Sequence, residues 1–163
     1  MFDHFWKGIV DLIYGTNRVR RRFERDNPGV KILAADASKG IATTTDQDLQ
    51  RGVEWVISQR AVILLTEKQI LCGKWTIPLN TVSGARLIEF TSLFGGGYVL
   101  KVQTMDGRNY QFGMQRNAEW TRQKRLPLVV EKGLVKHSAF SLITRISVLA
   151  CLAYWLYEEF FAR

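Results

Sequence analysis

The residues with the clearest capacity for chemistry in this 163-residue chain are basic. Near the amino terminus five arginines stand close together: Arg18, Arg20, Arg21, Arg22 and Arg25. A second cluster precedes the last apolar segment and comprises Arg116, Arg122, Lys124, Arg125, Lys132 and Lys136. Cationic groups at this density attract phosphate or carboxylate groups. Each cluster adjoins an apolar stretch and not an aromatic single-strand platform, so the pattern favours an anionic membrane surface over nucleic acid.

Residues suited to catalysis or metal binding are few. The two cysteines, Cys72 and Cys151, are far apart in the sequence, so neither a zinc module nor a disulfide framework is predicted. His4 lies in an apolar stretch and His137 lies near lysines, so neither resembles a general base. Three aspartates are predicted to be turn residues: Asp36, Asp46 and Asp48. We therefore expect no enzymatic activity, no metal and no cofactor.

Composition sets the class of the protein. There are 23 Lys and Arg residues against 15 Asp and Glu, which gives a formal net charge of +8, and 47% of the residues are hydrophobic. These values exclude a disordered or collagen-like chain, and the length suits one folded domain with a real core.

The first 28 residues read as an amphipathic helix followed by a basic linker. Apolar residues recur there at spacings of three and four: Phe2, Phe5, Trp6, Ile9, Leu12 and Ile13. The turn Asn27-Pro28-Gly29 ends the unit. The apolar face could lie in a membrane interface, or it could cover the core of the domain or a partner chain.

The segment 138–157 has 15 apolar residues in 20 and a single charge, Arg145. It is long enough to span a bilayer. Lys132 and Lys136 precede it, and an aromatic group that includes Trp155 lies at its other end, as at the two interfaces of a membrane. The alternative is a helix buried in protein, with Arg145 paired to a carboxylate of a partner.

Between these helices the sequence predicts an antiparallel β unit, because β-branched and aromatic runs alternate with turn signals. The candidate strands are 30–35, 53–66, 69–73, 75–79, 82–90, 98–104 and 109–113. Residues 66–68 predict a tight hairpin, Asp106-Gly107 predicts a two-residue turn, and residues 95–97 predict a flexible hairpin tip. Asn117 can cap a short helix over 118–126 that places Trp120 at one opening of the sheet.

Several runs, taken in order, resemble the pleckstrin-homology-like domains of the GRAM and bacterial PH type. The runs are AVILLT at 61–66, QILCG at 69–73, WTIPL at 75–79, MDGRNYQF at 105–112 and NAEW at 117–120. The resemblance covers about 29–126 and implies a seven-stranded, partly open barrel capped by a helix. It also implies a non-catalytic surface for lipid head groups or protein segments. The connection over 38–52 carries both basic and acidic residues, which argues against a specific inositol-phosphate pocket.

The sequence therefore predicts an α+β chain in four parts: the amphipathic helix and basic linker (1–28), the PH-like domain (29–126), a basic linker (127–137) and a C-terminal apolar helix (138–163). We expect a membrane-associated adaptor module or accessory subunit with its domain on the cytoplasmic side, protein partners at the terminal helices, and no nucleic acid. Homo-oligomers are also compatible with the pattern. The expected membrane or anionic-lipid contacts are Trp6, Arg18, Arg20, Arg21, Arg22, Arg25, Lys132, Lys136, Arg145 and Trp155. The alternative is a soluble subunit of a larger assembly, with both terminal helices buried on partner chains.

Overall fold

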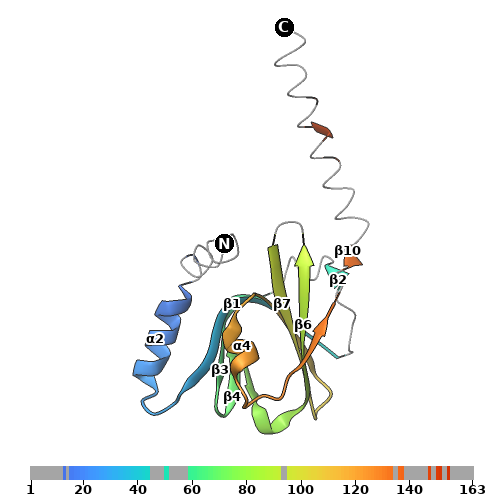
Figure 1. Ribbon diagram of the computed structural model, residues 1–163. Coiled ribbons are helices and arrows are strands. Elements are labelled where there is room, and N and C mark those ends of the chain that lie inside the picture. Colours follow the sequence, from blue (N-terminus) through green and yellow to red (C-terminus); the bar gives the residue numbers. More distant parts are fainter. Residues whose placement is uncertain are drawn as a thin grey trace.

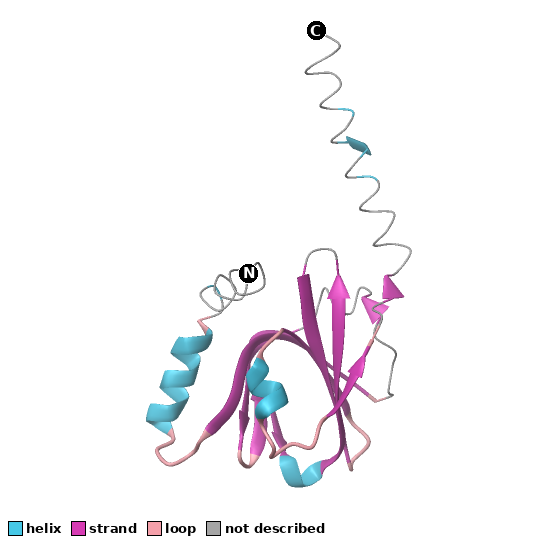
Figure 2. Ribbon diagram, in the orientation of Figure 1, coloured by secondary structure: helices cyan, strands magenta, loops and turns pink. Residues whose placement is uncertain are grey.

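The computed structural model describes residues 15–44, 50–51, 59–92, 95–133 and 136–137, and the single positions 13, 147, 150, 151 and 154. These residues form an α+β fold built on an eight-stranded, mostly antiparallel open sheet (Figures 1 and 2). The predicted amphipathic helix, apart from Ile13, and most of the apolar segment 138–157 lie outside the described residues. Within the described part of the chain, no helix is long and apolar enough to cross a membrane.

The sheet has the strand order β5-β4-β3-β1-β8-β7-β6-β9. All neighbours pair antiparallel except β9, which runs parallel to β6. Its strands are β1 (Ile32–Thr43), β3 (Gln59–Thr66), β4 (Gln69–Cys72), β5 (Trp75–Pro78), β6 (Val82–Ser92), β7 (Gly95–Thr104), β8 (Asn109–Gln115) and β9 (Val129–Lys132). A separate parallel pair joins β2 (Gln50–Arg51) to β10 (Lys136–His137). The helices are α2 (Thr16–Asp26), the 3₁₀ turn η1 (Leu79–Thr81) and α4 (Ala118–Arg122).

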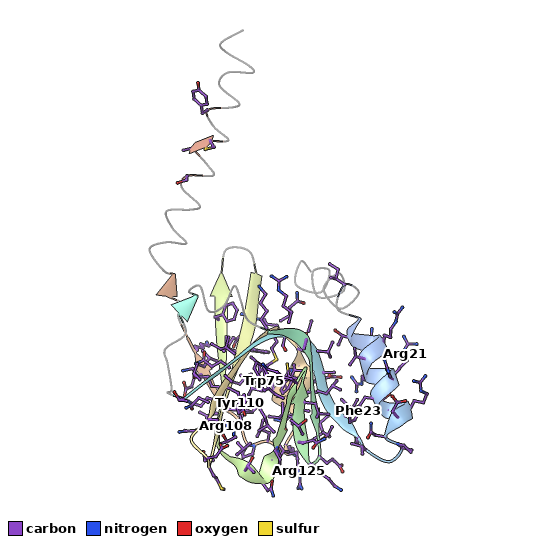
Figure 3. The ribbon with its side chains drawn as sticks, turned by 180° about the vertical axis from the view of Figure 1, so that it is seen from behind. Arg21, Phe23, Trp75, Arg108, Tyr110 and Arg125 are labelled. Carbon is purple, nitrogen blue, oxygen red and sulfur yellow. The ribbon has the colours of Figure 1, made fainter. Side chains whose placement is uncertain are left out.

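The sheet is strongly curled around its core. Trp75 belongs to the edge strand β5, yet its ring lies 5.9 Å from that of Tyr110 and 5.8 Å from that of Phe112, both on β8 (Figure 3). In the sheet order β4, β3 and β1 separate these two strands, so the side chains meet across the interior. Gly40 of β1 makes room for this contact, because a Cβ there would lie 2.4 Å from Trp75.

The core fills the inside of this curl. Trp120 of α4 is fully buried and packs with apolar side chains from the strands. The largest of these side chains are Phe112, Ile63, Leu65, Ile70, Leu87 and Leu100. The side chain of Asn117 accepts a hydrogen bond from the Glu119 N–H at 3.0 Å, which confirms the predicted helix cap. The helix ends at Arg122 and not at Leu126, because Gln123 is extended and its side chain makes two 2.8 Å hydrogen bonds with the Leu126 backbone.

Most predicted strands lie where the sequence indicated, but β1 is longer than expected. It continues to Thr43 through residues that were assigned to a connection, and Asp36 is a fully buried strand residue and not a turn residue. The stretch is made mainly of alanine, serine, lysine and glycine, which carry little β-propensity, so only its packing reveals it. Likewise β9 occupies part of the expected basic linker, where its pairing with β6 gives it a strand conformation.

Two turn predictions were wrong in detail. Four residues, Met105 to Arg108, separate β7 from β8, and only Gly107 among them has a positive φ, at 82°. Asp106 instead accepts a hydrogen bond from the Thr104 hydroxyl. The glycines at 95–97 are not a flexible tip, since they lie in β7 and pair with residues 90–92 of β6.

The positions of α2, β10 and η1 relative to the edges of the domain can be followed in Figure 1. The amino end of α2 and β10 both lie toward the edge of the domain that is uppermost in Figure 1, whereas η1 lies at the lower edge. Across the domain, α2 and β10 lie on opposite sides, as both Figure 1 and the reversed view in Figure 3 show.

The glycine at position 97 is required for close packing. A Cβ there would lie 2.7 Å from the carbonyl oxygen of Met114 and 2.7 Å from the ring of Phe90. We expect Gly97→Ala to lower the free energy of unfolding by about 1–3 kcal/mol, because backbone cannot move aside cheaply. Gly96→Ala is the control, since the atoms nearest to its Cβ would belong to the guanidinium end of Arg116 and not to the backbone, and we expect a loss below about 1 kcal/mol. Equal losses in urea denaturation would contradict this explanation.

Candidate functional site

Helix α2 carries the densest group of charged residues in the described chain, and it has two distinct faces. Thr16, Arg20, Phe23 and Asn27 follow one another at spacings of four, three and four, so they share one side of the helix. Phe23 on this side packs against Ile32, Ala35 and Leu64 on the outer surface of the sheet (Figure 3). This side of α2 is therefore the docking side.

A single carboxylate fixes α2 to both the sheet and α4. One oxygen of Glu119 accepts a 2.9 Å hydrogen bond from Arg20 of α2, and the other accepts a 3.0 Å hydrogen bond from the Ala35 N–H of β1. Asn117 completes the joint, because its side chain donates to the Ala35 carbonyl oxygen at 3.0 Å. Helix α2 is thus held by the Arg20–Glu119 ion pair and the apolar contact of Phe23, while two backbone hydrogen bonds fix Asn117 and Glu119 to β1.

The electrostatics of this joint favour its charged form. Burial raises the pKa of Glu119, but the hydrogen bond and charge of Arg20 and the hydrogen bond from Ala35 outweigh it. The pKa of Glu119 therefore lies below its ordinary value of 4.5. The same contact raises the pKa of Arg20, so both groups are charged at neutral pH.

The opposite side of α2 is an arginine face, formed by Arg18, Arg21, Arg22 and Arg25. These positions are spaced at three, one and three residues, which places them across from the docking side. All four side chains are exposed and together line a shallow hollow, and Arg21 points away from the sheet (Figure 3). The face can bind anionic groups without moving the helix.

Acidic residues moderate the charge of the arginine face only in part. Asp26 lies 3.1 Å from Arg25 and 3.6 Å from Arg22. Such exposed pairs contribute little and exchange readily with other anions. No carboxylate of the described residues lies within ion-pair distance of Arg18 or Arg21.

The structure separates the predicted contact residues into groups. Arg18, Arg21, Arg22 and Arg25 share one face, whereas Arg20 is turned toward Glu119 and serves as an anchor. Lys132 is exposed on β9, and Lys136 is in β10. Trp6, Arg145 and Trp155 lie outside the described residues. The arginine run, expected to be a linker, is an 11-residue helix.

Sequence reasoning missed Glu119 and the distinct role of Arg20. One signal was present, because Phe23 is the one aromatic residue among the arginines and marks the side of the helix that packs. Arg20 precedes it by three positions and so shares that side. Nothing in the sequence indicated that the partner would be Glu119, which is distant along the chain.

The thiol of Cys72 is held in unreactive surroundings. Cys72 is buried, and its sulfur lies 3.2 Å from the Ser38 hydroxyl oxygen. Burial raises the pKa of the Cys72 thiol, so it stays protonated at neutral pH. Among the described residues, no three His, Cys, Asp or Glu side chains are grouped so that they could hold a metal ion.

The Glu119 joint gives a pH-dependent contribution to stability. Because the folded-state pKa is lowered, the contribution is present above pH 4.5 and is lost as the pH falls through the folded-state pKa. We expect Glu119→Gln to lower the free energy of unfolding by about 1 kcal/mol at pH 7, with the difference from wild type shrinking below pH 4.5. Glu24→Gln is the control, since Glu24 is an exposed residue of α2 itself and contacts Arg20 at 3.4 Å. A pH-independent difference in denaturation experiments would refute this assignment.

Comparison with known proteins assigns no family to this chain. No protein-family model matches the sequence, and no curated protein matches it. The functional argument therefore depends on the geometry of α2, its joint to the sheet, and the edge that carries β10.

Proposed function

We propose that this protein is a non-catalytic binding module of the pleckstrin-homology-like type, held at a membrane with its domain on the cytoplasmic side. The strand order supports the family. β1 pairs with both β3 and the last antiparallel strand β8, whereas β5 and β6 are consecutive strands that are not paired with each other. A partly open barrel requires such a break, and the buried Trp120 of α4 suits a capping helix.

The observation that carries the membrane proposal is the position of the amino end of α2 and of β10. The amino end of α2 follows the apolar residues 2–13, and β10 precedes the apolar segment 138–157. Both lie toward the same edge of the domain (Figure 1). Two apolar segments that leave from one edge can enter one bilayer without wrapping around the domain.

Basic residues near that edge fit the same proposal. Lys132 ends β9 and is exposed, Lys136 is in β10, and Arg18 is in the first turn of α2. Cationic residues beside a membrane segment are attracted to anionic lipids at about 1 kcal/mol each. Trp6, Arg145 and Trp155 remain proposed contacts of the apolar segments themselves.

The membrane proposal is tested by extraction. We expect the full-length protein to stay with membranes after alkaline carbonate and to be released by detergent, because a 20-residue apolar helix resists removal from lipid. A shortened chain that ends at His137 keeps β10, and carbonate should release it.

Full-length protein that is soluble without detergent would exclude a membrane-held module. If that soluble protein were also a stable, monodisperse oligomer, the terminal helices would be buried on partner chains instead.

The orientation of the domain is tested with fluorescent labels. In a Cys151→Ser background, where Cys72 is buried, single cysteines replace Lys136 at the upper edge or Glu67 in the β3–β4 turn. After reconstitution we expect nitroxide lipids to quench an environment-sensitive dye at position 136 and not at position 67. Equal quenching at both positions would mean that the domain does not face the bilayer with the β10 edge.

A further inference from the structure

The arginine face and the proposed membrane edge point in different directions. α2 and β10 lie on opposite sides of the domain in both views (Figures 1 and 3). The arginine face is the side of α2 that is turned away from the sheet, and therefore away from β10. If the chain enters a flat bilayer just after His137, that bilayer cannot also lie along the whole arginine face.

The length of the arginine face is a further argument against a bilayer that lies along all of it. Arg18 and Arg25 are seven residues apart, which corresponds to about 10 Å along a helix. Figure 1 shows α2 running from near the upper edge toward the lower one, so Arg25 lies farther from that edge than Arg18. A bilayer at that edge would place its head groups near Arg18, while Arg22 and Arg25 lie farther along the helix and away from it.

From this geometry we infer that the arginine face binds an acidic segment of a partner protein. This inference uses the proposed membrane placement only to exclude lipid as the occupant. A guanidinium group is planar and binds a carboxylate through two parallel hydrogen bonds, and four of them along one helix face match an acidic helix or extended segment.

The composition of the face favours protein over nucleic acid. Asp26 lies beside Arg22 and Arg25, and a protein segment can place a cation opposite it among its acidic residues, whereas a nucleic acid backbone presents only anionic groups. Among the described residues of the face none is aromatic, so these residues provide no aromatic platform for stacked bases.

The helix is also held ready for binding. Phe23 and the joint formed by Arg20, Glu119 and Ala35 fix α2 to the sheet from its other side. A partner therefore meets a preformed row of guanidinium groups, which lowers the entropic cost of association.

The experiment uses full-length protein in nanodiscs of uncharged phosphatidylcholine and a fluorescein-labelled, glutamate-rich peptide, with a glutamine-rich peptide as the ligand control. Anisotropy should show binding of the glutamate peptide alone. A variant with Arg18, Arg21, Arg22 and Arg25 all changed to Gln should bind it at least about tenfold more weakly. The matched control changes four exposed basic residues elsewhere, Arg60, Lys68, Arg122 and Lys124, to Gln, and its affinity should stay within about twofold of wild type.

Three results would overturn the inference. The first is equal weakening in both variants, which would show a general effect of net charge. The second is binding of a thymidine oligonucleotide more tightly than the peptide. The third is no peptide binding, together with association to phosphatidylserine discs that only the arginine-face variant loses, which would make lipid the occupant. If the protein fails to enter nanodiscs, the membrane proposal fails, and the same comparison of variants in buffer still decides the inference.

Discussion

The structure depends on β1 being paired on both of its edges. β3 lies on one edge and β8 on the other, so this strand joins the two halves of the curled sheet. The small residues of β1 allow other side chains to approach this strand closely. Gly40 leaves space for Trp75 inside the sheet, and Ala35 gives its N–H and its carbonyl oxygen to Glu119 and Asn117 outside the antiparallel ladder. A larger side chain at Gly40 would displace the aromatic cluster that fills the curl.

The orientation of helix α2 is set by its contacts with β1 and with Glu119. Phe23 packs against the apolar cluster that contains Ala35, and Glu119 connects the helix to the same residue of β1. Because Arg20 is used in this joint, the remaining arginines are held on the far side in a fixed arrangement. The basic residues of α2 therefore have two separate roles: Arg20 attaches the helix to the sheet, and the other arginines are exposed on the opposite side. The helical repeat determines which residues fall on each side.

The sequence predicted the parts of the fold that have local signals. The apolar run at 61–66, the turn at 66–68 and the Asn117 cap are examples, since each depends on neighbouring residues. The far half of β1, the pairing of β9 with β6 and the role of the glycines at 96 and 97 depend on residues distant along the chain. The arginine face was half predicted: the cluster was evident, but separating Arg20 from its neighbours required knowing which side of α2 meets the sheet.

The parallel pairing of β9 with β6 has a mechanical consequence. The chain runs up β9, continues the ladder with a 2.9 Å hydrogen bond from the Gly133 N–H to the Glu89 carbonyl oxygen, and then enters β10. Tension applied from beyond His137 would load β9 along its length, so its hydrogen bonds to β6 would be sheared together and not peeled one by one. The domain is thus joined to whatever follows β10 through a connection that resists pulling and transmits force to β6 along the edge of the sheet.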